Sequence, residues 1–313
     1  MSELVVYTSF SFILDTFDIS MRARYPDEHF HLVTHRDHGQ TITKLIEKEV
    51  KAGERTADIV ILPHWAVLNL QLKGLLKPYE SPEYEGYRKE FYDPKGAWCA
   101  MALSPIGIMS NTNLINDEEA PKTLGEALDG RWRGKLAIHE VTDNSQGQMG
   151  TTYLTALHRI LGEKRWNELI DKIIDMKPKQ YDCTPEMALA VGRGQYYLAI
   201  PTNRACVSYS LDMAGEPLRF MMPTDVPYMV SFAPTIAMVA GGRNPNWAEN
   251  AFNFALSEDW QYRVEGLGGK IPPRRGIASS NPVPEDAQYF PILEDAANIP
   301  KFLELLKKKL PDV

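Results

Sequence analysis

This sequence of 313 residues lacks several features that mark whole classes of protein. It has no run of eighteen apolar residues, so it predicts no membrane-spanning helix. Its three cysteines are odd in number and widely spaced, which excludes a disulfide framework and favours buried thiols at Cys99, Cys183 and Cys206. The net charge of −7 leaves no basic surplus that would suit nucleic acid.

Familiar catalytic motifs are also missing. The sequence has no Gly-x-Ser-x-Gly elbow, no phosphate loop of the Gly-x-x-x-x-Gly-Lys type and no dinucleotide-binding glycine fingerprint. We therefore expect no enzyme, and the alternative from that class is a cleft enzyme with His139 as base and Glu140 as its orienting partner. No signal segment precedes the first predicted strand, which indicates either a cytoplasmic protein or a chain that begins after a removed leader.

The first sixty residues alternate predicted strands and helices. Apolar runs predict strands at 4–7, 29–33 and 57–62, and an amphipathic helical stretch follows the second of them. This alternation predicts a parallel sheet with helices on its faces. Because ligands of such sheets bind beyond the carboxyl ends of the strands, we expect the polar loops there to share one cleft.

The middle of the chain predicts a second lobe. Further strands alternate with helices, and the expected strands are 106–109, 136–138, 196–200, 218–222 and 229–239. Ser104-Pro105 predicts a crossing between lobes, because proline lacks an amide donor and restricts the residue before it. We expect lobe 1 to comprise 1–104 and 232–313, lobe 2 to comprise 105–231, and the ligand cleft to lie between them.

An ordered set of segments resembles the solute-binding proteins of ABC importers, in the branch that includes the ferric-iron binders. The segments are Val5-Val6-Tyr7-Thr8, Ala57-Asp58-Ile59-Val60, Gly74-Leu75-Leu76-Lys77-Pro78-Tyr79, Asn111-Thr112-Asn113, Trp132-Arg133-Gly134-Lys135-Leu136-Ala137-Ile138 and Leu198-Ala199-Ile200-Pro201. The resemblance implies an α/β fold of the type II periplasmic-binding kind, with two lobes, each a mixed sheet flanked by helices, and a two-strand hinge. It also implies a monomer in the periplasm or outside the cell, without a cofactor, that delivers a small molecule to a membrane permease.

The same resemblance argues against iron as the ligand. In the ferric binders a pair of adjacent tyrosines follows the strand that matches 196–200, and this sequence has Arg204 and Ala205 there. The histidine of that family aligns near Ser11, and its glutamate near Pro63 or His64. A guanidinium suits a carboxylate or phosphate rather than a metal ion. We therefore expect a small anionic ligand (carboxylate, phosphonate or similar), with ferric iron or a ferric chelate as the alternative.

Hydroxyl and amide side chains at the expected helix starts support an anion site. Unpaired backbone amides there favour negative charge, although helix capping explains the same residue types. Arg204 adds a fixed positive charge, and His139 ends a strand of the second lobe. The predicted ligand-binding residues are Thr8, Ser9, Ser11, His38, His64, Trp65, His139, Asn144, Ser145, Asn203, Arg204 and Phe232.

Histidines and aromatic residues leave two further questions open. His35 and His38, with Asp37 and the later His64, have the ligand types of a transition-metal site, but polar loop residues or anion contacts are the favoured interpretation. We expect no metal site. The aromatic residues expected to wall the cleft are Phe10, Trp65, Tyr228 and Phe232.

Overall fold

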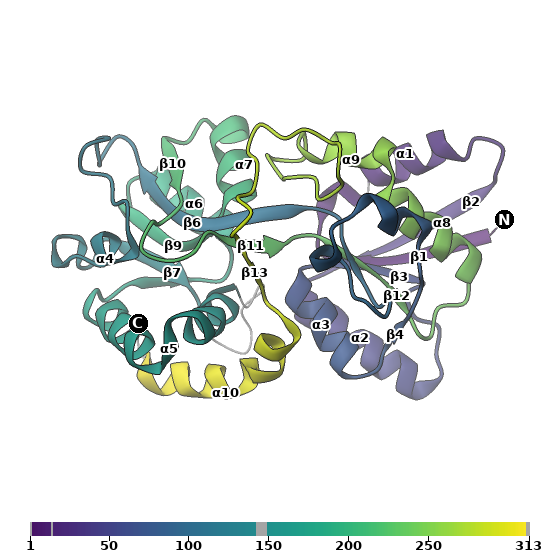
Figure 1. Ribbon diagram of the computed structural model, residues 1–313, viewed down its shortest axis with the longest axis horizontal. Helices are drawn as coiled ribbons and strands as arrows, with labels where there is room; N and C mark the ends of the chain where they lie inside the picture. Colours follow the sequence, from purple (N-terminus) through teal and green to yellow (C-terminus); the bar gives the residue numbers. More distant parts are fainter. Residues whose placement is uncertain (1, 14, 142–148, 311–313) are drawn as a thin grey trace. The chain divides into compact units, whose positions relative to one another are not determined.

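The computed structural model describes residues 2–13, 15–141 and 149–310 (Figure 1). They form two compact units: unit 1 holds Met1–Leu103 and Phe232–Pro282, and unit 2 holds Ser104–Ser231 and Val283–Val313. The chain therefore passes between the units three times. None of the described helices is long and apolar enough to cross a membrane.

Unit 1 is built on a six-stranded mixed sheet. The strand order is β2 (Phe30–Arg36), β1 (Ser2–Thr8), β3 (Ile59–Leu62), β12 (Thr235–Val239) and β4 (Leu76–Lys77), and β5 (Cys99–Ala100) also pairs with β12. β1 runs parallel to β2 and β3, whereas β12 runs antiparallel to β3. β3 is buried along its whole length, in keeping with its uninterrupted apolar sequence. The parallel arrangement predicted for the first sixty residues is confirmed.

The helices of unit 1 have sequence-encoded ends. They are α1 (Thr16–Arg24), α2 (Gly39–Ala52), α3 (His64–Leu72), α8 (Pro245–Leu256) and α9 (Glu258–Val264), with 3-10 turns η1 (Ser11–Ile13), η2 (Pro82–Gly86) and η3 (Lys89–Phe91). α2 buries Ile42 and Ile46, one turn apart, and ends at Gly53, whose φ of 67° is left-handed. Ser257 caps α9 by accepting a hydrogen bond from the backbone N–H of Trp260.

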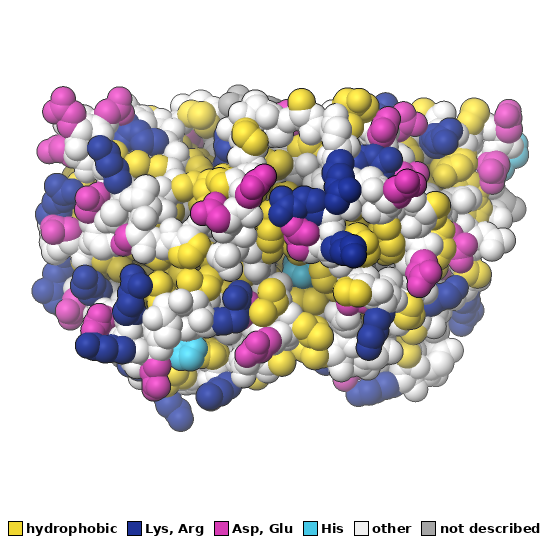
Figure 2. Space-filling model, viewed as in Figure 1, with side chains coloured by type: hydrophobic (Ala, Val, Ile, Leu, Met, Phe, Trp, Pro, Cys, Tyr) yellow, Lys and Arg dark blue, Asp and Glu magenta, His cyan; other side chains and the backbone are white. Residues whose placement is uncertain are grey.

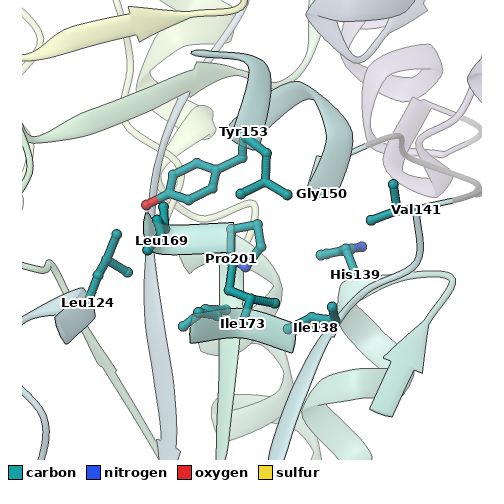
Figure 3. A pocket seen from close by; sticks show the side chains of 11 residues that line it. Leu124, Ile138, His139, Val141, Gly150, Tyr153, Leu169, Ile173 and Pro201 are labelled. Carbon is teal, nitrogen blue, oxygen red and sulfur yellow. The ribbon is translucent and has the colours of Figure 1, made fainter. Parts of the chain in front are cut away.

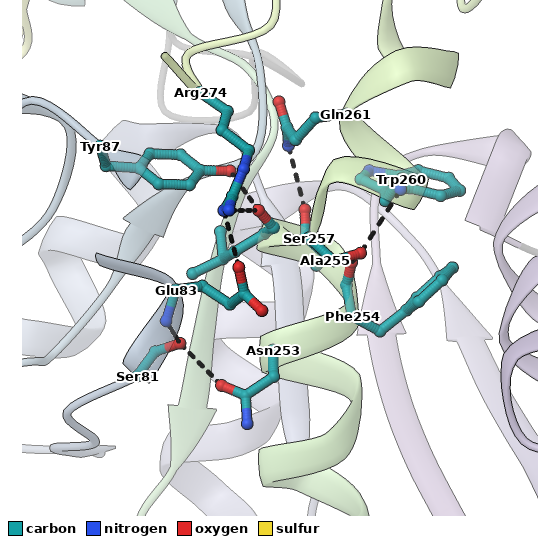
Figure 4. Close-up of polar contacts among 11 residues, drawn as sticks. Ser81, Glu83, Tyr87, Asn253, Phe254, Ala255, Ser257, Trp260, Gln261 and Arg274 are labelled. Atoms are coloured by element: carbon teal, nitrogen blue, oxygen red, sulfur yellow. Dashed lines mark hydrogen bonds and ion pairs between the residues drawn. The ribbon is translucent and has the colours of Figure 1, made fainter. Parts of the chain in front are cut away.

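Arg274 fixes the end of α8 to the turn at η2 (Figure 4). Its Nη1 donates to Glu83 Oε2 (2.7 Å) and to the carbonyl of Leu256 (2.9 Å), the last residue of α8. The hydroxyl of Tyr87 donates to the same carbonyl at 3.1 Å. Because the last carbonyls of a helix have no partner within the helix, these two donors satisfy a group that would otherwise be left unpaired.

Unit 2 is built on a seven-stranded mixed sheet. The order is β13 (Gln288–Phe290), β11 (Met229–Phe232), β6 (Leu103–Asn111), β9 (Leu198–Asn203), β7 (Leu136–His139) and β8 (Lys179–Tyr181), with β10 (Leu218–Met221) paired to β6. The single strand expected at 229–239 is instead two strands, β11 and β12, which belong to different sheets. The strand is interrupted at Ala233-Pro234, where proline has no N–H for a ladder.

The helices of unit 2 are α4 (Leu124–Ala127), α5 (Met149–Asp175), α6 (Thr184–Gly192), α7 (Arg204–Ala214) and α10 (Leu293–Lys309), with a 3-10 turn η4 (Gly130–Trp132). α5 contains a kink at Gly162, whose φ of 76° and ψ of 163° are not helical. The sequence predicts two helices here, at about 147–161 and 163–175, and the kink lies at the residue between them. Glycine reaches this conformation without a Cβ clash.

The assignment of 283–313 to lobe 1 is wrong. These residues belong to unit 2, where Figure 1 shows α10 lying along α5. Phe302 and Leu306 of α10 share a core cluster with Trp166 of α5. The physical reason is that the apolar stripe of α10 is buried against α5, and burial of such a stripe supplies most of the stability of a helix.

Candidate functional site

Three loops of unit 1 leave the same edge of its sheet. Thr8, the last residue of β1, is in register with Arg36 of β2 and with Ile61 of β3. Because all three strands are parallel, their carboxyl ends meet, as the sequence predicts. The predicted residues Ser9, Ser11, His38, His64 and Trp65 follow these strand ends.

Thr8 and Ser11 differ in how their hydroxyls are used. Thr8 is buried, and its Oγ1 donates to the carbonyl of Ile61 (2.9 Å) and accepts from the N–H of Phe10 (3.1 Å). Thr8 therefore holds the loop in place, so its expected role as a ligand contact is replaced by a structural one. Ser11 is exposed at the start of η1.

Ser9 and Trp65 carry hydrogen-bond donors without partners in the part of the chain that the structure describes. The Oγ of Ser9 and the Nε1 of Trp65 are buried and have no hydrogen-bond partner among the described residues. A Cβ at Gly39 would lie 3.1 Å from Cζ2 of Trp65, so the indole ring packs on the first residue of α2. His38, the N-cap of α2, makes no side-chain cap. The indole of Trp65, whose N–H has no partner among the described residues, therefore lies close to the start of α2, where the first backbone N–H groups have no partner within the helix.

His64 and Phe232 lie in the interior of unit 1. The His64 ring centroid is 4.3 Å from that of Trp98 and 4.8 Å from that of Phe232, and its Nδ1 is 3.3 Å from Thr235 Oγ1. Burial lowers the pKa of His64 to about 3, so the imidazole is neutral at physiological pH. The expectation that these two side chains face a ligand is corrected: both pack in the core, together with Phe91.

The histidines expected near the first cleft loops do not converge. The ring of His35 lies 5.1 Å from that of Tyr7, whereas His38 is exposed and His64 is buried. Within 2–13, 15–141 and 149–310 there is no group of three His, Cys, Asp or Glu side chains that could hold a metal ion. The alternative metal site at His35, Asp37, His38 and His64 is therefore not assembled by these residues.

His139 lines a small cavity in unit 2 (Figure 3). The cavity is about 20 Å³, which is room for about one water molecule. Its other walls include Tyr153 and Pro201 and are otherwise aliphatic or glycine: Leu124, Ile138, Val141, Gly150, Leu154, Leu169, Ile173 and Ile200. Burial lowers the pKa of His139 to about 4, with a hydrogen bond to the Asp182 backbone opposing the shift. His139 is therefore a buried neutral residue, not the ligand contact expected from the sequence.

The alternative acid–base pair of His139 and Glu140 is not seen in the described contacts. His139 Nε2 lies 2.8 Å from Thr184 Oγ1, and the backbone of Asp182 provides its other contact. These partners are fixed parts of unit 2. The predicted ligand residues Asn144 and Ser145 lie outside the described residues.

Asn203 and Arg204 form the start of α7. The Oδ1 of Asn203 accepts from the N–H of Ala205 (2.9 Å) and from Ser104 Oγ (2.6 Å), so this oxygen is used in capping the helix. Arg204 is the first residue of α7, and none of the ion pairs and hydrogen bonds found among described side chains involves it. Its guanidinium is therefore a positive charge that no described carboxylate neutralises.

Arg204 and Tyr228 line a hollow of about 350 Å³ in unit 2. The Tyr228 pKa is raised by burial, and the positive charge of Arg204 partly opposes that rise, so the two groups are electrostatic neighbours. Figure 2 shows acidic and basic side chains interspersed over the face that it draws. On that face, attraction for an anion must therefore come from particular side chains rather than from a broad surface of one sign.

The sequence analysis did not identify the other residues of this hollow. They are Val207, Ser208, Leu211, Leu218, Phe220, Met221 and Met222. The signal that could have found the helical ones is their spacing, because residues 204, 207, 208 and 211 share one face of a helix. The residues from β10 carry no comparable sequence signal.

A sequence profile described as bacterial extracellular solute-binding protein matches residues 54–298. The chain belongs to this family. No curated protein matches the chain.

Solved structures of ABC-transporter substrate-binding proteins have the same fold. A substrate-binding protein from Agrobacterium tumefaciens has a TM-score of 0.83 and 16% identity over 99% of this chain and 94% of that one. Iron-bound HitA from Pseudomonas aeruginosa has a TM-score of 0.81 and 18% identity, over 99% and 100% of the two chains. AfuA from Actinobacillus pleuropneumoniae, with fructose-6-phosphate bound, has a TM-score of 0.81 and 17% identity, over 100% and 99%.

This solute-binding protein therefore has the type II periplasmic-binding fold that the sequence predicts. Its family and these neighbours are substrate-binding proteins of transport systems rather than enzymes. Such proteins bind small ligands and work with a membrane permease, and the family acts in the periplasm or outside the cell.

Proposed function

We propose that this solute-binding protein of an ABC importer captures a small anion, such as a carboxylate or phosphonate, and that Arg204 binds the anionic group. The observation that carries the proposal is Arg204 itself, a guanidinium without a described acidic partner, at a helix start and beside a hollow of about 350 Å³. Arginine presents planar paired donors that match a carboxylate or phosphonate. The Tyr228 hydroxyl adds a further donor to the same hollow.

The unpaired donors of unit 1 support the same class of ligand. Ser9 and Trp65 each bury a donor that no described group accepts, and Trp65 packs on the start of α2. A buried donor without an acceptor costs about 1–3 kcal/mol, so such groups are retained where something accepts from them. Capture by closure of the two units is part of the proposal, because a ligand shifts such an equilibrium by its differential affinity for the closed state.

The experiment is isothermal calorimetry on wild type, Arg204→Ala and a matched control, Arg193→Ala. Arg193 is an exposed arginine of unit 2 at the end of α6, and it does not line the hollow. The titrants are acetate, benzoate, methylphosphonate, phenylphosphonate, citrate and ferric citrate. Because Arg204 and the anion would form a hydrogen-bonded charge pair, we expect Arg204→Ala to lose affinity by at least about tenfold. We expect no change of affinity in Arg193→Ala.

Two results would contradict the proposal. Equal affinity of Arg204→Ala and wild type for an anion that binds would remove Arg204 from the site. Binding of ferric citrate, with no binding of any iron-free anion, would instead support the ferric alternative.

A further inference from the structure

The hollow beside Arg204 has two chemically different ends. Along α7 it is lined by Arg204, Val207, Ser208 and Leu211, which succeed one another on one face of the helix. Seven residues of helix rise by about 10 Å, so Leu211 lies about that far from the start of α7. Leu211 is 44% exposed and apolar. The hollow thus runs from a positive charge towards an apolar wall.

β10 and the segment after it add further apolar side chains to the lining of the hollow. These are Phe220 and Met221 of β10 and Met222, which follows that strand. All three are partly exposed, and Phe220 and Met221 also pack against the core of unit 2. An aromatic ring and flexible thioether side chains form a surface that accepts flat or irregular apolar groups.

The size of the hollow favours a larger anion over an ion as small as phosphate or acetate. Its volume of about 350 Å³ falls in the range typical of pockets for whole small molecules, about 300–1,000 Å³. A phosphate or acetate ion at Arg204 would fill only a small part of it. The apolar walls would then stay in contact with water, and their burial would contribute nothing to affinity.

We propose that the ligand is an amphipathic anion, with one carboxylate or phosphonate at Arg204 and an apolar aryl or alkyl body lying between α7 and β10. This inference rests on the proposed function, because it assumes that Arg204 holds the anionic group. It narrows the ligand from small anions in general to those that carry an apolar body of several carbons. The opposite charges of guanidinium and anion fix the orientation of the molecule in the hollow.

The test compares anions that differ only in their apolar body. Benzoate is paired with acetate, and phenylphosphonate with methylphosphonate, in calorimetric titrations of the whole protein. The apolar walls are altered by Leu211→Ser, and the matched control is Leu293→Ser, since Leu293 is 43% exposed, lies in unit 2 and is not part of the hollow. Both leucines are exposed enough for the change to leave the fold intact.

In wild type and in Leu293→Ser we expect the aryl anion of a pair to bind at least about tenfold more tightly than its methyl counterpart. Leu211→Ser should reduce this ratio, and Arg204→Ala should weaken both members of the pair. Equal binding of the two members, with both weakened by Arg204→Ala, would overturn the amphipathic ligand and leave the proposed function standing. No binding of any of the four anions or of citrate, or binding that is unaffected by Arg204→Ala, would overturn both.

Discussion

Arg159 on α5 and Asp295 on α10 form a bidentate ion pair, with Nε to Oδ1 at 2.9 Å and Nη2 to Oδ2 at 3.1 Å. The Asp295 side chain is 2% exposed and that of Arg159 is 28% exposed. Asp295 also accepts a hydrogen bond from the N–H of Ile292 at the start of α10. The pair therefore fixes α10 to unit 2 at the end where the helix begins.

Arg159→Ala should lower the free energy of unfolding by about 2–4 kcal/mol, because it leaves a buried carboxylate without its charged partner. Urea unfolding followed by circular dichroism measures this. Arg165→Ala, at an exposed arginine of the same helix, is the control and should stay within about 0.5 kcal/mol of wild type. Equal effects of the two substitutions would show that the ion pair contributes no specific stability.

The stability of the protein should fall below neutral pH because of His64 and His139. Burial lowers their pKa values to about 3 and about 4, whereas an unfolded histidine has a pKa of about 6.5. The unfolded chain therefore binds more protons, so the stabilisation is present above pH ~6.5 and is lost as pH falls towards these lowered values. At pH 5 the loss is about 2 kcal/mol for each histidine.

Urea unfolding at pH 7 and pH 5 tests this dependence. His64→Asn should reduce the difference between the two pH values by about 2 kcal/mol. The control is His29→Asn at an exposed histidine, which should leave the difference unchanged. A wild-type protein whose stability is the same at both pH values would contradict the prediction.

Gly107 should not tolerate a side chain. A Cβ at this position of β6 would clash with the carbonyl oxygen of Met221 on the paired strand β10. Gly107→Ala should therefore lower the free energy of unfolding by about 1–3 kcal/mol by pushing the two strands apart. Thermal unfolding measures this loss of stability. The control is Gly130→Ala, because nothing lies within 4 Å of a Cβ added at Gly130. The prediction fails if both variants melt at the wild-type temperature.

Ser9 and Thr8 are adjacent hydroxyl residues, and removing their hydroxyls should have different effects on the stability of the ligand-free protein. Ser9→Ala removes a buried hydroxyl that has no described partner, so stability should be unchanged or higher by up to about 1 kcal/mol. Thr8→Val removes a hydroxyl that bonds to Ile61 and Phe10 and should cost about 1–2 kcal/mol. Urea unfolding compares the two. A larger loss of stability in Ser9→Ala than in Thr8→Val would contradict the different roles assigned to the two hydroxyls.

The regular elements were predictable because their sequence periods are strong. β3 is an uninterrupted apolar run, and the glycine in α5 coincides with the predicted helix boundary. The prediction of a single strand at 229–239 was wrong. The sequence does carry a signal for the interruption, because Pro234 lies in the middle of this range. The assignment of α10 was wrong because an apolar stripe shows that a helix packs, not which core it packs against.

The candidate site was less predictable than the fold. The position of Arg204 at a helix start follows from the strand and loop before it, and the structure has it there. The burial of His64 does not follow from sequence, because a histidine after a strand is compatible with both a cleft and a core. The walls of the hollow depend on the side chains of β10, which the chain brings to α7 only in the folded unit.

The order of strands in unit 1 has a consequence for the growing chain on the ribosome. β12 lies between β3 and β4 and ends at Val239, so the position between these two strands stays vacant until that residue has been synthesised. At translation rates of about 5–20 residues per second, on the order of ten seconds pass between the synthesis of the first 103 residues and the synthesis of β12. During that interval the edge of β3 is an open template for wrong pairing, so the nascent chain should depend on chaperone protection until Val239 emerges.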